Sequence, residues 1–195
     1  MTSYTAFLRG INVGGHKLIK MEELNRIFVS LGFKNIKTFI QSGNVLFDAP
    51  GKSSAAALEK PDKKIEAKIE AGLKKALGYE VRTTVRTVDE LKKLIELDPF
   101  KKFSKLSPKE AKMYVSFLYD EPEHKPKLPY KSPEKDFEII GMNKLSSREV
   151  FIIAYPSVKK GGDYMTYLSK EFKKIQNTTR NWNTILKMIS PISNE

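Results

Sequence analysis

The sequence lacks cysteine entirely and holds only two histidines, His16 and His124, which lie far apart in the chain. Without cysteine the protein can form no disulfide, present no thiolate nucleophile and build no cysteine metal centre. Two distant histidines also argue against a zinc site or another histidine-rich metal centre. We therefore predict no metal site, and the sequence assigns neither a cofactor nor a catalytic residue.

Long apolar runs are missing as well. No stretch approaches the roughly 18 apolar residues of a membrane span, and the N-terminal residues do not follow the pattern of a secretory signal. We therefore expect a cytoplasmic protein that does not enter a membrane. The 195 residues suffice for one large domain or two small ones, and 40% hydrophobic residues can supply a core.

Acidic residues are in deficit, because 35 Lys and Arg stand against 23 Asp and Glu and give a formal charge of +12. The excess is spread over both halves, and many lysines stand beside glutamates on predicted helices. Diffuse charge of this kind gives weak, salt-sensitive binding to any polyanion. It is typical of a solvated lysine-rich surface and does not by itself predict a nucleic-acid function.

Hydrophobic periodicity predicts a βαββαβ order for the first half. The expected strands are residues 4–9, 35–40, 45–47 and 80–86, and the expected helices are residues 21–31 and 61–77. This order is that of the ferredoxin-like fold. Its sheet has the strand order 4-1-3-2.

The second half has a similar but less regular rhythm. We expect helices at residues 88–97, 164–175 and 179–189, and strands at residues 113–119, 137–141 and 149–155. The prediction is an α+β fold of two subdomains: a ferredoxin-like one over residues 1–90 and a smaller, related α+β one over residues 91–195 that ends in helices. No sequence repeat between the halves is evident.

The first expected strand runs directly into a glycine-rich loop. This loop, from Arg9 to Lys17, contains Gly10, Asn12, Gly14 and Gly15. Glycine allows positive φ, and such loops can aim backbone N–H groups at an anion. It is not a phosphate loop of the G-x-x-x-x-G-K-[ST] type, because His16 stands where that pattern needs lysine. A tight connection without a ligand is the alternative.

A second polar turn, Gln41-Ser42-Gly43-Asn44, joins the second and third expected strands. In a ferredoxin-like sheet this hairpin lies at the same end as the close of the first strand, so we expect it to meet the glycine-rich loop. Two polar turns at one end of a sheet can form a concave site. The alternative is that hairpin turns are polar in any case.

A third polar cluster, from Thr178 to Thr184, is predicted to begin the last helix. Arg180 would then occupy a first turn, where a cation opposes the helix dipole. A bound anion or a neighbouring carboxylate would explain that position, and a structural ion pair or an ordinary surface arginine is the alternative. Asn183 falls on a neighbouring face, whereas Trp182 is expected in the core.

Together these motifs resemble the bacterial domain-of-unknown-function family numbered 1697. The resemblance covers essentially the whole chain and is carried by residues 6–15, 20–21, 31–33, 40–47, 85–87, 90–91, 98–100 and 179–184. It implies a two-subdomain α+β fold of ferredoxin-like type. The family has no established activity to carry over, so its motif residues mark a site without assigning roles.

We predict binding of a small anionic ligand or a nucleotide in a site formed by the glycine-rich loop, the 41–44 turn and the helix start at 178–187. The candidate ligand-binding residues are Arg9, Gly10, Asn12, Gly14, Gly15, Lys17, Gln41, Ser42, Asn44, Arg180 and Asn183. One alternative is a group-transfer or hydrolytic enzyme on the same site, although Ser42 has no evident base. The other is an RNA- or DNA-binding module that stacks bases on Tyr4, Phe7 and Phe47. The oligomeric state stays open.

Overall fold

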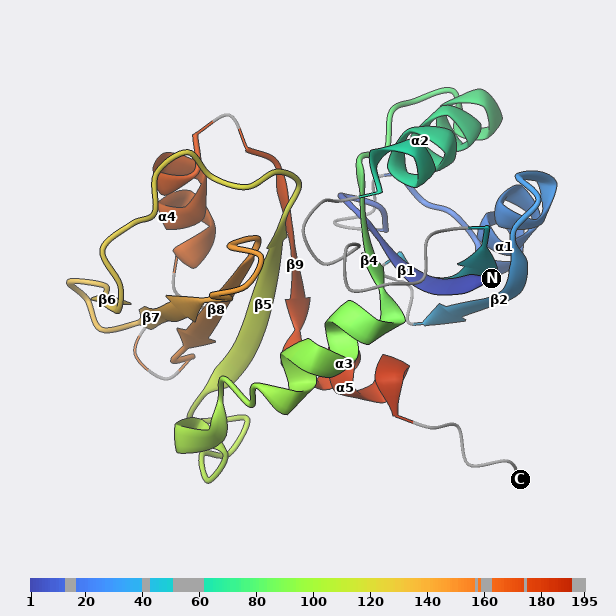
Figure 1. Ribbon diagram of the computed structural model, residues 1–195. Coiled ribbons are helices and arrows are strands. Elements are labelled where there is room, and N and C mark those ends of the chain that lie inside the picture. Colours follow the sequence, from blue (N-terminus) through green and yellow to red (C-terminus); the bar gives the residue numbers. More distant parts are fainter. Residues whose placement is uncertain are drawn as a thin grey trace. The chain divides into compact units, whose positions relative to one another are not determined.

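The computed structural model describes residues 1–12, 17–39, 43–50, 62–156, 158, 163–173 and 175–190. The chain divides into two compact units, Met1–Leu91 (unit 1) and Lys92–Glu195 (unit 2), which Figure 1 colours from blue to green and from green to red. Each unit contains one antiparallel sheet with helices. The predicted α+β fold of two subdomains is confirmed.

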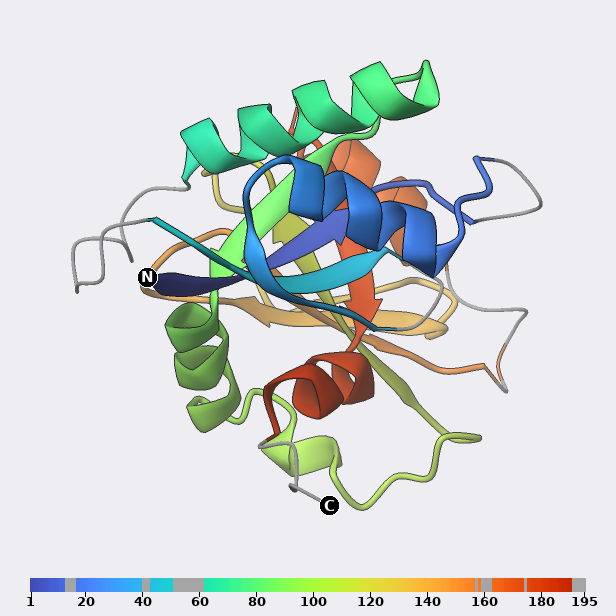
Figure 2. The same cartoon turned by 90° about the vertical axis from the view of Figure 1, so that its right-hand side faces the viewer.

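Unit 1 has the βαββαβ order that the periodicity predicts. Its elements are β1 (Thr2–Leu8), α1 (Met21–Ser30), β2 (Lys34–Phe39), β3 (Asn44–Ala49), α2 (Lys63–Leu77) and β4 (Thr83–Thr87), and α3 (Val88–Glu96) follows. The sheet order is β2-β3-β1-β4, the expected 4-1-3-2 arrangement. Both α1 and α2 cover the same face of this sheet (Figure 2).

The core of unit 1 lies between these helices and one face of the sheet. Tyr4 on β1 and Phe47 on β3 are paired residues whose rings stack at 5.7 Å, and both are buried. Burying one such side chain stabilises the fold by about 1.5–3 kcal/mol. Phe7, on the opposite face of β1, is also fully buried. None of these three aromatic side chains is exposed for base stacking.

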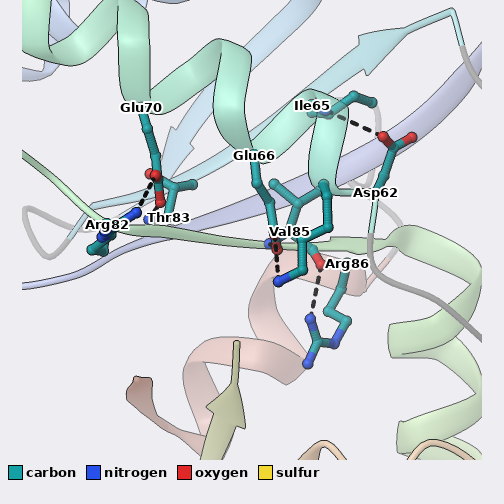
Figure 3. Close-up of polar contacts among 9 residues, drawn as sticks. Asp62, Ile65, Glu66, Glu70, Arg82, Thr83, Val85 and Arg86 are labelled. Carbon is teal, nitrogen blue, oxygen red and sulfur yellow. Dashed lines mark hydrogen bonds and ion pairs between the residues drawn. The ribbon is translucent and has the colours of Figure 1, made fainter. Parts of the chain in front are cut away.

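Carboxylates cover the outer edge of β4, an edge strand of the sheet. From α2, Glu70 accepts a hydrogen bond from the Thr83 N–H at 2.9 Å and Glu66 accepts one from the Val85 N–H at 2.9 Å (Figure 3). Glu90 accepts from the Thr87 N–H at 2.6 Å. A row of unpaired N–H groups on an edge strand can pair with a strand of another chain. By accepting these N–H groups, the three carboxylates prevent such pairing along β4.

Unit 2 contains β5 (Lys112–Leu118), β6 (Tyr130–Lys131), β7 (Phe137–Met142), β8 (Glu149–Ala154), α4 (Tyr164–Glu171), β9 (Asn177–Asn181) and α5 (Trp182–Ile189), after the short helix η2 (Lys101–Phe103). Its sheet order is β6-β7-β8-β5-β9. The prediction of a helix over residues 179–189 was wrong at its start. Residues 177–181 pair with β5 as a strand, and the helix begins only at Trp182.

The two units are structural repeats of each other. Without β6, the order β7-β8-β5-β9 reproduces β2-β3-β1-β4. The central strands read Tyr-Thr-Ala-Phe-Leu at 4–8 and Tyr-Val-Ser-Phe-Leu at 114–118. They share a register, because Tyr4 pairs with Thr87 as Tyr114 pairs with Asn181. The helix α1 has no counterpart, since residues 119–136 hold four prolines and the strand β6 instead.

The repeat extends to the last strand of each unit. Arg86 on β4 donates from Nη1 to the carbonyl of the preceding residue, Val85, at 2.9 Å, and Arg180 on β9 donates in the same way to Thr179 at 3.0 Å. Both arginines are buried. Each precedes a residue that caps the following helix by accepting a backbone N–H, Thr87 for α3 and Asn181 for α5.

Candidate functional site

The glycine-rich loop of unit 1 is closed by Asn12. Its side chain accepts a hydrogen bond from the Ile19 N–H at 2.8 Å and donates to the Ile19 carbonyl at 3.1 Å. Asn12 and Gly10 both have positive φ, at 53° and 69°. The predicted ligand residues Gly14 and Gly15 lie outside the described residues. Asn12 therefore has a structural task that the sequence did not indicate.

Two residues of this loop, Arg9 and Lys17, bond to the segment that precedes β4. Lys17 donates from Nζ to the Glu80 carbonyl at 3.1 Å, and the same Nζ lies 5.2 Å from the centroid of the Tyr79 ring. The Arg9 N–H donates to the Arg82 carbonyl at 2.8 Å, whereas the Arg9 side chain is exposed. Of these two predicted ligand residues, Lys17 is therefore held by its side chain and Arg9 by its backbone.

The turn between β2 and β3 meets the end of β1, as the fold requires. The Leu8 N–H donates to the Gly43 carbonyl at 2.8 Å, and a Cβ on Gly43 would lie only 2.5 Å from the Ile11 Cδ1. Asn44 is fully buried, and its Nδ2 donates to the Phe39 carbonyl at 3.1 Å. Asn44 thus helps to close the hairpin. Gln41 and Ser42 lie outside the described residues.

Arg180 of unit 2 is a buried strand residue. Its Nη1 donates to the Thr178 Oγ1 at 2.6 Å as well as to the Thr179 carbonyl. Burial lowers the pKa of Arg180 to about 10, so the guanidinium stays charged at neutral pH. The argument that Arg180 opposes a helix dipole does not apply, because α5 begins two residues later.

Unit 2 contains a cavity of about 370 Å³ at the start of α5. Two of the motif stretches that the sequence indicates line it, 98–100 through Asp98 and Phe100, and 179–184 through Asn181, Trp182 and Asn183. The remaining walls come from Leu186 on α5, from the segment before β5 and from β5 itself. The last two contribute Ser104, Leu106, Pro108, Ala111, Lys112 and Met113. Segments that are distant in the sequence thus meet at one cavity.

The floor of this cavity is held by aromatic packing. The Phe100 ring lies 5.2 Å from the Trp182 ring and 5.9 Å from the Phe151 ring, and all three are buried. Asp98 has a φ of 42°, a conformation that aspartate tolerates better than most residues. With this positive φ, the chain that leaves α3 changes direction at Asp98 and becomes part of the cavity wall.

The polar groups of the cavity carry mixed charge. Lys112 supplies an ammonium group and Asp98 a carboxylate, and both residues are exposed. Asn181 accepts from the Asn183 N–H at 2.9 Å as the cap of α5, whose first turn contains no acidic residue. A helix start without acids favours an anion, so the cavity offers partners both for an anionic group and for a hydrogen-bond donor.

Of the predicted ligand residues, only Asn183 lines this cavity. Sequence reasoning missed Asp98, Ser104, Lys112, Asn181 and Trp182 as lining residues. The signal was present for Asp98, Asn181 and Trp182, because residues 98–100 and 179–184 were among the motif stretches. The predicted residues Arg9, Gly10, Asn12, Lys17 and Asn44 belong to unit 1, so a single site shared with Arg180 and Asn183 stays a prediction.

Within the described ranges no three His, Asp or Glu side chains gather as a metal site would need. In the same ranges, none of the helices has the length and apolar character that crossing a membrane requires.

The comparisons with known proteins concern the family and the fold. A family model described as "Protein of unknown function (DUF1697)" matches residues 1–144. A conserved bacterial protein, SP0830 from Streptococcus pneumoniae, has a similar structure, with a TM-score of 0.66, 21% sequence identity and 96% of each chain covered. At this identity the likeness bears on the fold alone. None of the curated proteins matches the chain.

Proposed function

Since the chain belongs to the DUF1697 family, which is described only as of unknown function, we propose a function from the geometry: the unit 2 cavity binds a small anionic ligand that also carries a hydrogen-bond donor. A nucleotide or a sugar phosphate has this chemistry. One observation carries the proposal. The segments Asp98–Phe100 and Asn181–Asn183, both among the motif stretches predicted from the sequence and the first within the residues 1–144 that the family model matches, line the same cavity of about 370 Å³.

The chemistry of the walls supports this class of ligand. The Lys112 ammonium and the acid-free start of α5 attract an anionic group such as a phosphate. Asp98 repels that group but accepts a hydrogen bond from a hydroxyl or an amine elsewhere on the ligand. Phe100 and Trp182 provide an apolar floor against which a ring can pack. An anion without a donor would gain nothing from Asp98.

The test is a thermal-shift screen of the full chain against nucleotides, sugar phosphates, small carboxylates and inorganic phosphate, followed by calorimetric titration of any hit. Ligand at about 100 times its dissociation constant stabilises the folded state by roughly 2.7 kcal/mol. Lys112→Met and Asn183→Ala should weaken binding. Lys109→Met, an exposed lysine outside the cavity lining, is the matched control for loss of charge.

Asp98→Asn separates the two parts of the ligand. It should weaken binding of a sugar phosphate, whose hydroxyl loses a charged acceptor, and strengthen binding of inorganic phosphate, because a repelling carboxylate is removed. Arg9→Ala tests the shared site that the sequence predicts, and a loss of about tenfold in affinity is expected if Arg9 contacts the ligand. Equal binding by wild type, Lys112→Met and Asn183→Ala would refute the cavity as the site.

A further inference from the structure

The helix α2 of unit 1 has its acidic and basic residues on different faces. It contains five lysines and two glutamates. Both glutamates turn inward to β4, where Glu66 and Glu70 accept the backbone N–H groups of Val85 and Thr83 (Figure 3). Glu66 is fully buried, and the Glu70 side chain is 16% exposed. Closing the edge of β4 thus removes the acids of α2 from its outer surface.

The outer face of α2 consists of lysine and alanine. Helical periodicity places Lys64, Ala67, Lys68, Ala71 and Lys75 on one stripe, and all five are exposed. We call this stripe the lysine face. Two more lysines flank it, with Lys63 paired to Glu66 at 3.1 Å and Lys74 paired to Glu80 at 3.0 Å. Among the described residues of α2, no carboxylate lies on the lysine face.

This arrangement works against the stability of the helix. Lys64 and Lys68 are four residues apart, a spacing at which like charges repel. Lys63 and Lys64 stand in the first turn, where cations oppose the helix dipole. Lys74 and Lys75, in the last turn, do complement the dipole. A helix selected for stability alone would place glutamate at position 64 or 68, so the lysine face needs another reason.

The repeat supplies an internal comparison. In unit 2, α4 occupies the place of α2. Along the chain, α4 lies between β8 and β9 as α2 lies between β3 and β4. The charged residues of α4 are Lys170 and Glu171, one of each sign. The same position in the fold therefore does not require a row of lysines. The row belongs to unit 1 specifically.

We propose that the lysine face of α2 binds the phosphate backbone of nucleic acid, independently of base sequence. The cations at 64, 68 and 75 extend over about 16 Å of helix at 1.5 Å per residue. The alanines between them leave room for a sugar-phosphate backbone to approach. Lysine contacts to phosphates position a protein without reading bases. A membrane surface fits less well, because the apolar side chains of α2 are packed in the core and cannot enter lipid.

Lys68 has a second contact that bears on the design of the test. Its Nζ lies 5.1 Å from the centroid of the Phe33 ring. Replacing lysine by glutamine keeps the helix propensity nearly unchanged, and the Cβ and Cγ groups of the three exposed side chains stay. The variant Lys64→Gln/Lys68→Gln/Lys75→Gln should therefore fold, which far-UV circular dichroism and the thermal midpoint will verify. Single variants at 64 and 75 replace the triple variant if Lys68→Gln lowers the midpoint.

The experiment measures the anisotropy of a fluorescein-labelled 20-nucleotide single strand, and of the matching duplex, titrated with full-length protein from 25 to 200 mM salt. The control variant Lys125→Gln/Lys127→Gln/Lys144→Gln removes the same charge from exposed positions of unit 2 outside the cavity lining. If all three lysines contact phosphates, the slope of log affinity against log salt should become shallower by about 2 on single strands, at roughly 0.7 per contact.

The control variant should keep most of the affinity and the wild-type slope, and two strands of different sequence should bind alike. Equal losses in both triple variants would overturn the proposal, since only net charge would then matter. No binding at 25 mM salt would overturn it as well. Binding to anionic lipid vesicles without binding to oligonucleotides would assign the lysine face to a membrane instead.

Discussion

Gly43 is the position where the structure makes the sharpest energetic prediction. It has a φ of 73°, and a Cβ there would lie 2.5 Å from the Ile11 Cδ1, 2.8 Å from the Ile11 Cγ1 and 2.9 Å from the Leu8 Cβ. The left-handed conformation costs a non-glycine residue roughly 1–2 kcal/mol. Forcing a methyl group into a packed site adds about 1–3 kcal/mol. After subtraction of the roughly 0.4–1 kcal/mol that Gly→Ala gains through the unfolded state, we expect Gly43→Ala to destabilise the protein by about 1–4.5 kcal/mol.

Gly10→Ala is the matched control for this prediction. Gly10 has nearly the same φ, 69°, but a Cβ there meets no atom within 4 Å. Gly10→Ala therefore carries the cost of the left-handed conformation but no steric clash. The roughly 0.4–1 kcal/mol that Gly→Ala gains through the unfolded state partly offsets this cost. Gly10→Ala should therefore cost only about 1 kcal/mol. The difference between the two variants measures how tightly the β2–β3 turn packs on the end of β1.

A double-mutant cycle identifies the atom responsible. Ile11→Val removes the Cδ1 that lies nearest to the added methyl group and costs roughly 0.5–1.5 kcal/mol by itself. The double variant Gly43→Ala/Ile11→Val should lose less stability than the two single variants lose in sum. The difference, which is the coupling energy, should be at least about 0.5 kcal/mol. Urea unfolding followed by circular dichroism gives these values. Equal losses for Gly43→Ala and Gly10→Ala would refute the packing argument.

Local sequence patterns predicted most of unit 1 because each pattern there agrees with the packing. The stripe of Ile65, Ile69 and Leu73 on α2 faces the core, as its spacing indicates. Alternation along β1 likewise places Tyr4, Ala6 and Leu8 against the helices. The strand order 4-1-3-2 then follows from the βαββαβ order, and it brings the two polar turns together at Gly43.

The start of the last helix could not be read in this way, because four of the five residues from 177 to 181 are suitable caps. Asn177, Thr178, Thr179 and Asn181 all have side chains that accept a backbone N–H. Pairing with β5 decides among them, since residues 177–181 form an edge strand and Asn181 becomes the cap. The β-branched Thr178 and Thr179 favour a strand, and this was the local signal that the cap rule outweighed.

The repeat was hidden because its shared residues lie on strands, while the connections between them differ. A helix, α1, joins β1 to β2, but a proline-containing segment joins β5 to β7. What persists is the pattern Tyr-x-small-Phe-Leu on the central strands and an arginine followed by a capping residue on the last ones. Only the paired register, which the structure supplies, places these short matches at equivalent positions.

The role of an asparagine is ambiguous from sequence, because its side-chain amide can bond either to the backbone of a turn or to a ligand. Asn12 and Asn44 were predicted to bind a ligand, and each also bonds to backbone groups that close its own loop. Asparagine tolerates positive φ and imitates a backbone partner, so glycine-rich turns select it without any ligand. Asn183 differs, because its side chain lines a cavity that distant segments build. That distinction needs tertiary structure.

Two further predictions concern the repeat and the covered edge. Asn181→Ala and Thr87→Ala remove equivalent helix caps, so each should cost about 1 kcal/mol in urea unfolding; a loss in only one would argue against equivalent roles. The last prediction concerns Glu66, whose pKa is raised above 4.5 chiefly by burial. A carboxyl with a raised pKa holds its proton longer in the folded state, so folding loses stability as pH rises from the unfolded pKa to the folded one. Glu66→Gln keeps an oxygen to accept the Val85 N–H and removes this titration. The stability of Glu66→Gln relative to wild type should therefore rise with pH from about 4.5 and level off above the folded pKa, measured by urea unfolding from pH 4 to 8. A difference that is constant over this range would show that burial of Glu66 does not disfavour its charge, and the loss of the Lys63 pair would then be the main effect of the substitution.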